Sequence, residues 1–278
     1  MVYQPLDTLP STDELPCSDD TPVDNVGHWT SRSEDQNLLP NLLLLSLASL
    51  WSTRMDWFFA VDMAVYHTTG VSPKVPVVPD AFLSLGVERK KNGKSRKSYA
   101  VWEEGWTVPT VVLEMVSHRY NDEYGDKQAI YAKLGVLYYV VYNPEYWWRR
   151  HQKQQHHPFE VYKLENDTYH LQTDEPYWMA EVGIGIGRGR QVVGGIEQEV
   201  LLWYDQQGQA YPLSEQVIEE MQMRLEAAQR KLETTQQRAE AEQQRAEAEQ
   251  QRAEAERQRA DRLADYLRSQ GIDPDTIQ

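Results

Sequence analysis

The stretch VVLEMVS, residues 111–117, has the composition of a strand buried on both faces, yet it carries one charged side chain, Glu114. A short uninterrupted run of β-branched and apolar residues is typical of a central strand in an α/β sheet. A carboxylate buried there without a partner would be strongly destabilising. The sequence therefore predicts that Glu114 faces a metal ion or strong hydrogen-bond donors.

The residues after this strand predict a crossover connection. Residues 121–135 place acidic side chains in the first turn of an expected helix, apolar side chains at helical spacing, and Gly135 at its end. Residues 136–144, VLYYVVYNP, have the composition of a second buried strand. A strand, a helix and a strand with short connections imply a parallel pair within a mixed sheet.

The composition divides the chain into three parts. Residues 1–36 are rich in Pro, Asp, Ser and Thr, which predicts a flexible arm or a strap over the core. Residues 37–214 alternate apolar segments with turns and predict an α/β domain. It begins with a helix near 37–52 that is entered at Pro40, followed by strands over 56–67 and 75–86. Residues 215–278 include three near-identical heptads, QQRAEAE, between 236 and 256, which predict a long charged helix.

Two alternatives stay open for this C-terminal helix. One heptad position carries Ile218, Leu225 and Leu232, but Ala and Glu follow along the same seam. The helix is therefore either a solvated helix supported by pairs such as Arg238 with Glu242, or a coiled coil that forms a homodimer. A homodimer through the α/β domain is the other arrangement.

Net charge and cysteine content limit the classes of function. The net charge is −15, but residues 41–214 carry 20 acidic against 17 basic side chains. Overall acidity argues against indiscriminate binding of polyanions and leaves room for a local basic groove. The single cysteine, Cys17, excludes an intrachain disulfide, and no apolar segment has the length of a membrane span. A cytoplasmic protein that binds no membrane is expected.

Asp80 is a candidate partner for Glu114 because it lies just inside an expected strand, VPVVPDAFLSLG at 75–86. Two neighbouring strands could bring both carboxylates together. With the backbone carbonyl of Met115 they would offer the hard oxygen ligands that suit Mg²⁺, with Mn²⁺ as a substitute. Lys127, on the helix that follows, would add a cation. The structural alternative is that Asp80 caps a turn and that Glu114 is a strand acid paired with Lys127.

These segments resemble the Uma-two family, a branch of the PD-(D/E)xK, restriction-endonuclease-like superfamily. The resemblance rests on VPDAFLSLG, VVLEMVS and NDEYGDKQAIYAKLGVLYYVVYNP, and it is strongest over residues 56–145. It implies a restriction-endonuclease-like core, in which helices flank a central mixed sheet. It also implies a metal-dependent endodeoxyribonuclease that hydrolyses DNA phosphodiester bonds with Mg²⁺, with Asp80, Glu114 and Lys127 as catalytic residues.

The sequence departs from the superfamily at one position. The usual lysine lies two residues after the glutamate, where this chain has Val116. In the Uma-two family the lysine lies on the following helix, and Lys127 matches that position. A Lys127 side chain that pointed away from Glu114 would leave the site unable to orient a water molecule. A catalytically inactive nuclease-fold scaffold that assembles through its C-terminal helix is therefore the alternative function.

A basic loop at 88–97 is a candidate contact for DNA phosphates, although such runs are also common in solvated loops. Its basic residues are Arg89, Lys90, Lys91, Lys94, Arg96 and Lys97.

Two further motifs favour structural interpretations. The glycines of GIGIGRGR, residues 183–190, alternate with the period of a strand, which predicts close packing on one face and argues against a nucleotide-binding loop. His151, His156 and His157 lack the spacing of a zinc site and predict a solvated loop.

Overall fold

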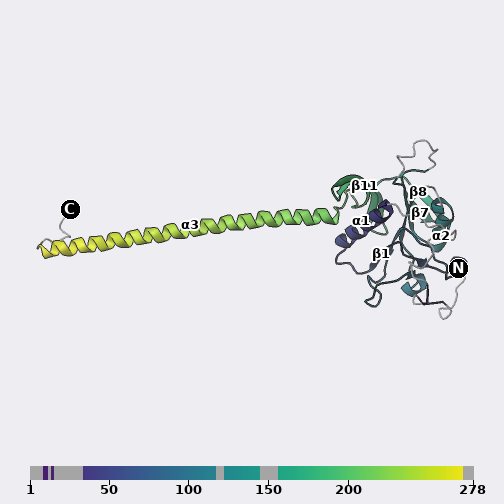
Figure 1. Ribbon diagram of the computed structural model, residues 1–278, viewed down its shortest axis with the longest axis horizontal. Helices are drawn as coiled ribbons and strands as arrows, with labels where there is room; N and C mark the ends of the chain where they lie inside the picture. The colour runs from purple at the N-terminus through teal and green to yellow at the C-terminus, as the bar shows by residue number, and fades with distance from the viewer. Residues whose placement is uncertain (1–8, 12–13, 16–33, 117–121, 145–155, 272–278) are drawn as a thin grey trace. The chain divides into compact units, whose positions relative to one another are not determined.

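The computed structural model describes residues 9–11, 14–15, 34–116, 122–144 and 156–271. The chain divides into two compact units, Met1–Ser214 and Glu215–Gln278. Figure 1 shows the helices and strands in chain order, from purple at the N-terminus to yellow at the C-terminus.

A mixed sheet of six strands forms the centre of the first unit, in the order β1-β3-β5-β6-β7-β8. β5 (Val111–Met115) and β6 (Tyr138–Tyr142) pair in parallel, and α2 (Asp126–Leu134) connects them. The other neighbouring pairs in this sheet are antiparallel. The remaining strands are β1 (Trp57–Val61), β3 (Ala81–Leu85), β7 (Phe159–Glu165) and β8 (Thr168–Gln172). The predicted crossover and mixed sheet are therefore confirmed.

The two faces of the sheet are covered by different helices, as Figure 1 shows. Leu113 and Met115 share a core with α1 (Glu34–Leu50), which contributes Leu39, Leu43 and Leu47. Val112 and Val116 share a second core with Tyr131 of α2. Because successive side chains of a strand point to opposite faces, Glu114 lies on the α2 face.

A smaller antiparallel sheet packs on α1. It consists of β9 (Tyr177–Met179), β10 (Ile184–Val193) and β11 (Ile196–Tyr204). The indole nitrogen of Trp203 donates a hydrogen bond of 2.9 Å to the carbonyl oxygen of Leu43, inside the core that β11 shares with α1. The first unit also contains a short parallel pair, β2 (Val65–Tyr66) and β4 (Tyr99–Ala100), and the 3₁₀ helices η3 (Val101–Glu104) and η4 (Asp122–Tyr124).

The glycine-rich motif lies on β10, as its alternation predicts. A Cβ atom at Gly187 would lie 2.9 Å from Cα of Pro176, and one at Gly189 would lie 2.5 Å from Cδ1 of Leu202. Close packing therefore favours glycine at both positions, and most strictly at Gly187, where the neighbouring atom belongs to the backbone. Gly183 differs because it precedes the strand and has a φ of 78° with no neighbour near its missing side chain.

Two expected elements have different bounds in the structure. α1 begins at Glu34, and Pro40 lies inside the helix rather than at its start. The segment expected as one strand over 56–67 is divided into β1 and β2, because Asp62 adopts a φ of 53° that ends the extended conformation.

The described part of the N-terminal segment packs on the core. Leu15 is buried in a cluster with Tyr66 and Trp102. The indole nitrogen of Trp102 donates a 3.0 Å hydrogen bond to the carbonyl oxygen of Pro10. At these residues the segment is a strap over β2, β4 and η3.

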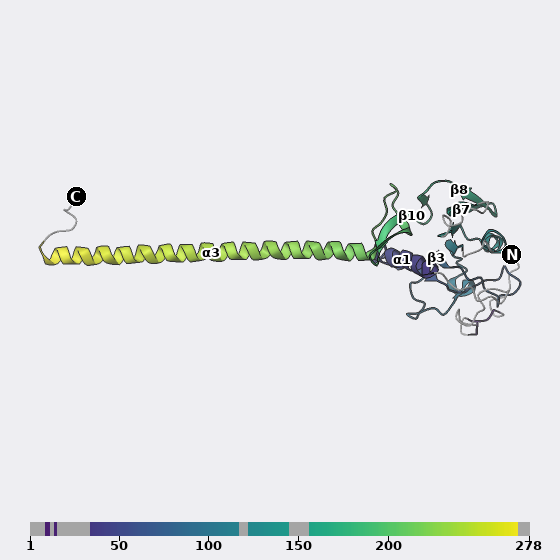
Figure 2. The same cartoon turned by 45° about the horizontal axis from the view of Figure 1, so that its top comes forward.

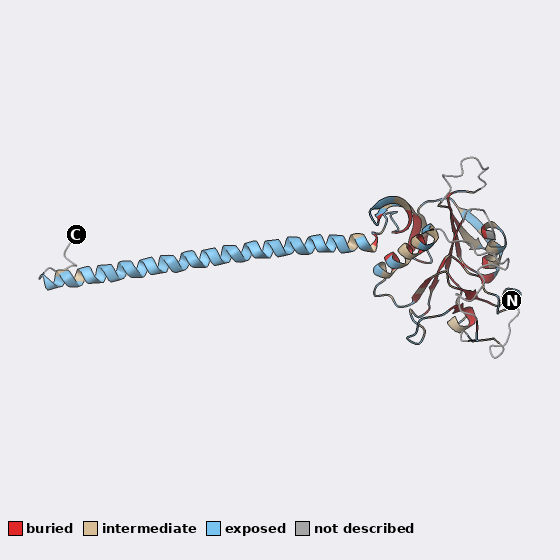
Figure 3. Cartoon of the chain, in the orientation of Figure 1, coloured by how far each residue is buried: buried red, intermediate tan, exposed pale blue. Residues whose placement is uncertain are grey.

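The long helix α3 (Ser214–Ser269) extends over 56 residues. None of its residues described here is buried, and it is coloured as exposed along almost its whole length in Figure 3. Ile218, Leu225 and Leu232 are each more than half exposed. Within the described residues, no helix combines the length and the apolar character needed to span a membrane. Figure 2 shows the same elements from a second direction.

Candidate active site

Glu114 lies near the carboxyl end of β5, and its side chain is 1% exposed. Its two carboxylate oxygens have different donors. The Lys127 ammonium group lies 2.9 Å from Oε2, and the Tyr131 hydroxyl donates a 2.7 Å hydrogen bond to Oε1. Both donors are on α2, four residues apart, so they project from the same face of the helix. A partly buried ion pair and a buried hydrogen bond therefore offset the cost of burying this carboxylate.

Asp80 immediately precedes β3, and its side chain reaches β5, the strand that carries Glu114. Ala81 pairs with Leu113 in the sheet, and the backbone N–H of Met115 donates a 2.6 Å hydrogen bond to Asp80 Oδ2. Burial raises the pKa of Asp80 well above its usual value, and the charge of Glu114 raises it further. Lys127 and the Met115 hydrogen bond oppose this rise in pKa.

Lys127 keeps its charge in this environment. Burial by itself would lower the pKa of Lys127, but Glu114 and Asp80 outweigh it, so the pKa lies above its usual value. About a quarter of the side chain is exposed, 26%, whereas the Glu114 side chain is 1% exposed. The Lys127 side chain is therefore only partly covered by the surrounding core.

The residues at this site fit a divalent cation with few protein ligands. Among the described residues, no three His, Cys, Asp or Glu side chains gather in a group that could hold a metal ion. The oxygens available are the carboxylates of Asp80 and Glu114 and the carbonyl of Met115, which are hard ligands of the kind Mg²⁺ prefers. Burial, and after it the charge of Glu114, raises the pKa of Asp80 and so disfavours its ionised form, which a bound divalent cation would favour. Water molecules would complete such a shell.

The acidic residues in the first turn of α1 are not positioned to serve as further metal ligands. Glu34 and Asp35 lie in the first turn of α1. This helix packs on the face of the sheet opposite Glu114. The charge of Asp35 instead acts on Tyr142, which is in the core shared with α1.

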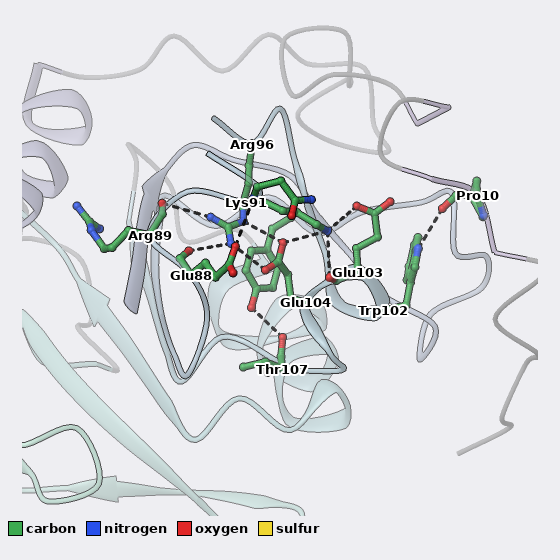
Figure 4. A network of polar contacts seen from close by, with 11 residues as sticks. Pro10, Glu88, Arg89, Lys91, Arg96, Trp102, Glu103, Glu104 and Thr107 are labelled. Atoms are coloured by element: carbon green, nitrogen blue, oxygen red, sulfur yellow. Dashed lines mark hydrogen bonds and ion pairs between the residues drawn. The ribbon is translucent and has the colours of Figure 1, made fainter. Parts of the chain in front are cut away.

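Lys91 and Arg96 of the basic loop are bound to acidic residues of η3, as Figure 4 shows. Arg96 is bound to both carboxylate oxygens of Glu104, at 2.9 and 2.8 Å, and its side chain is 2% exposed. Lys91 lies 2.7 Å from Glu103, and the Arg89 guanidinium lies 3.5 Å from the centre of a Trp57 ring. The three remaining basic residues, Lys90, Lys94 and Lys97, are exposed.

The other motifs of the sequence contribute little to this site. His156 lies in a 3.6 Å pair with Glu160 and stacks on Tyr124. Tyr138 and Tyr139 are buried in the two cores. His151 lies outside the described residues.

Tyr131 is the residue of this site that the sequence did not reveal. Its spacing with Ile130 and Leu134 indicates an apolar helix face, and Tyr131 is indeed fully buried. The signal for a polar role is its position four residues after Lys127, on the face that meets β5. Val116, at the position of the superfamily's usual lysine, is 1% exposed and belongs to the core on the α2 side.

Comparisons with known proteins agree with the resemblance noted in the sequence. Residues 30–189 match the Uma2 family, whose description is "Putative restriction endonuclease". A solved structure, described as a putative nuclease belonging to DUF820 from Anabaena variabilis ATCC 29413, is similar with 10% identity and a TM-score of 0.38. The similarity covers 54% of this chain and 73% of that chain. No curated protein matches the sequence.

The family match confirms the predicted resemblance and the predicted fold class. Restriction-endonuclease-like proteins generally use divalent metal ions, and nucleases of this family suggest DNA as a substrate. Because the family model spans more than half of the sequence, this chain belongs to the Uma2 family.

Proposed function

We propose that the chain is a Mg²⁺-dependent endonuclease that hydrolyses phosphodiester bonds of DNA, with residues 37–214 as its catalytic domain. One observation carries this proposal. A carboxylate in the middle of the sheet, Glu114, is held by two donors of α2, and a second carboxylate, Asp80, is bound to the next residue of the same strand. Such a concentration of buried charge is typical of functional sites.

Each residue has a distinct role in the proposed reaction. Asp80, Glu114 and the carbonyl oxygen of Met115 would hold the divalent ion, for which Mn²⁺ could substitute. Mg²⁺ bound at this site would supply positive charge to the scissile phosphate and lower the pKa of a water molecule. Lys127 donates hydrogen bonds and offsets the negative charge that develops on the phosphate oxygens. Its pKa lies above the usual value, so it does this in the charged form.

DNA would be bound through the exposed side of the basic loop. Lys90, Lys94 and Lys97 are exposed and can approach backbone phosphates, which are recognised mainly by cationic side chains. Arg89, Lys91 and Arg96 would instead fix the shape of the loop through their contacts with Trp57 and with the acidic residues of η3.

A nicking assay on supercoiled DNA tests this function. We expect the full chain to nick the DNA with Mg²⁺ and to lose this activity with a chelator. The variants Glu114→Gln and Asp80→Asn should lower the rate at least about a hundredfold. Glu165→Gln, at an exposed position of β7, is the matched control and should nick at the normal rate. Unchanged nicking by purified Glu114→Gln would rule out the assignment.

The alternative is a nuclease-fold scaffold without catalytic activity, and one observation favours it. The ammonium group of Lys127 forms an ion pair with Glu114 and can itself supply the positive charge that this carboxylate needs. In this case the exposed Ile218, Leu225 and Leu232 of α3 would assemble a homodimer, which sedimentation of the full chain would detect. Calorimetric titration with Mg²⁺ separates the two functions: binding that Asp80→Ala removes supports the nuclease, and no binding supports the scaffold.

A further inference from the structure

We propose that Tyr131 is a positioning residue of this site, whose hydroxyl fixes the rotation of the Glu114 carboxylate and thereby sets the affinity for a divalent ion. This inference rests on the proposed function, because it takes Glu114 as a ligand of the ion. It assigns a role in the site to a residue whose side chain would contact Glu114 and neither the ion nor the DNA.

The geometry of α2 carries the first step. The Tyr131 hydroxyl donates to Oε1 of Glu114 at 2.7 Å, and the Lys127 ammonium lies 2.9 Å from Oε2. The two donors are four residues apart on one helix. A carboxylate held at both oxygens by one rigid element has a defined plane, so its remaining lone pairs have fixed directions.

The second step is that the two donors differ in rigidity. Lys127 carries its charge on a flexible four-carbon chain that is 26% exposed. Tyr131 is fully buried, and its ring lies 5.4 Å from the ring of Tyr139 in the core on the α2 side. The phenol therefore determines the orientation of Glu114 more strongly than the ammonium group does.

The third step concerns what the hydroxyl does for ligand geometry. Groups that hydrogen-bond to a metal ligand orient it, and their loss typically weakens metal binding about 10- to 100-fold. Without the Tyr131 hydroxyl, Oε1 of Glu114 would lose its donor, and the carboxylate could rotate about the remaining contact with Lys127.

Tyr139 offers a matched control in the same core. It is as deeply buried as Tyr131, but its hydroxyl donates a 2.6 Å hydrogen bond to the backbone carbonyl of Glu123 instead of to Glu114. Tyr131→Phe and Tyr139→Phe each remove one buried hydroxyl and one hydrogen bond from neighbouring rings. A purely structural role of the hydroxyl would therefore make the two variants behave alike.

The test compares metal binding of the full-length wild type, Tyr131→Phe and Tyr139→Phe by calorimetric titration with Mn²⁺ and with Mg²⁺. Thermal unfolding without metal should show similar, modest decreases in Tm for both variants, which confirms that both fold. We expect the Kd of Tyr131→Phe to rise about tenfold or more. We expect Tyr139→Phe to keep the wild-type Kd within about twofold, since it leaves Glu114 untouched.

Three outcomes would overturn the inference. A wild-type Kd in Tyr131→Phe would show that the hydroxyl has no effect on the ion, and the proposed function would still stand. An equal rise in Kd for both variants would show a general effect of the core. A wild-type chain that binds neither ion would overturn the proposed function and this inference together.

Discussion

Lys127 lies 2.9 Å from Glu114, although 13 residues separate them and one is on a helix and the other on a strand. The carboxylate is buried, whereas the lysine side chain is partly exposed. The pair therefore joins α2 to the central strand β5 across the core on the α2 side. Its loss should be visible in stability as well as in any activity.

Replacing Lys127 with Met should destabilise the fold. The change keeps most of the side-chain volume but leaves the Glu114 carboxylate buried with Tyr131 as its remaining partner. Removing one member of a buried ion pair costs about 3 kcal/mol of unfolding free energy. Urea unfolding at pH 7.5 measures it. Lys133→Met, at an exposed position of the same helix, should change the unfolding free energy by less than about 0.5 kcal/mol. Equal stabilities of the two variants would contradict an important Lys127–Glu114 pair.

Replacing the three exposed lysines of the basic loop should weaken DNA binding without affecting the fold. The triple variant Lys90→Gln, Lys94→Gln, Lys97→Gln removes three cationic groups from the surface. If each contacts one phosphate, the slope of log K against log salt should decrease in magnitude by about 2 to 3. Fluorescence anisotropy with labelled duplex DNA at several salt concentrations measures this slope.

The internal arginine of the same loop serves as the contrasting variant. Arg96→Gln breaks the two hydrogen bonds to Glu104 and should lower the unfolding free energy by about 3 kcal/mol. An unchanged salt slope in the triple variant would show that the loop does not bind DNA. A fully stable Arg96→Gln variant would show that the pair with Glu104 does not hold the loop.

His67 should make stability depend on pH. It is 4% exposed, and burial, with the charge of Lys133, lowers its pKa from 6.5 to about 4. At pH values between about 4 and 6.5, His67 is protonated in the unfolded chain but neutral in the folded chain. The stabilising contribution of neutral His67 is therefore complete above pH 6.5 and is lost as the pH falls toward 4. The loss approaches about 3 kcal/mol at the acid end.

Urea unfolding of wild type and His67→Gln at pH 7.5, 6 and 4.5 isolates this contribution. The variant lacks the imidazole, so its stability should decrease less than that of the wild type over the same interval. Parallel decreases in both proteins would show that other groups cause the acid sensitivity.

Much of the sheet could be predicted because its central strands carry local signals. The apolar runs around Glu114 and at 138–142, with a helix that ends at Gly135, specify a parallel pair. The antiparallel pairing of β1 with β3 and of β3 with β5 could not be predicted from the local sequence. It depends on contacts between residues such as Ala81 and Leu113 that are far apart in the chain. The positive φ of Asp62, which divides the first expected strand, also has no clear signal in the sequence.

The site was only partly predictable for a similar reason. A charge within an apolar strand is visible in the sequence, and so is a lysine on the next helix. Tyr131 is hidden because a tyrosine at helical spacing is usually a core residue, and its hydroxyl partner is known only from the packing of α2 on β5. The sequence also could not show which basic residues of the loop are exposed. A run of like charges does not distinguish the buried side chain of Arg96 from the exposed side chain of Lys94.

The position of Val116 has a consequence for how such chains are recognised. Under the proposed assignment Lys127 supplies the ammonium group from α2, so the strand needs no lysine at position 116. Valine there fills the core on the α2 side. A sequence pattern that requires the acidic residue and the lysine within three neighbouring positions will miss proteins whose lysine lies on the following helix. A pattern that pairs the acid with a lysine one helix later, followed by a tyrosine on the next turn, would retrieve them.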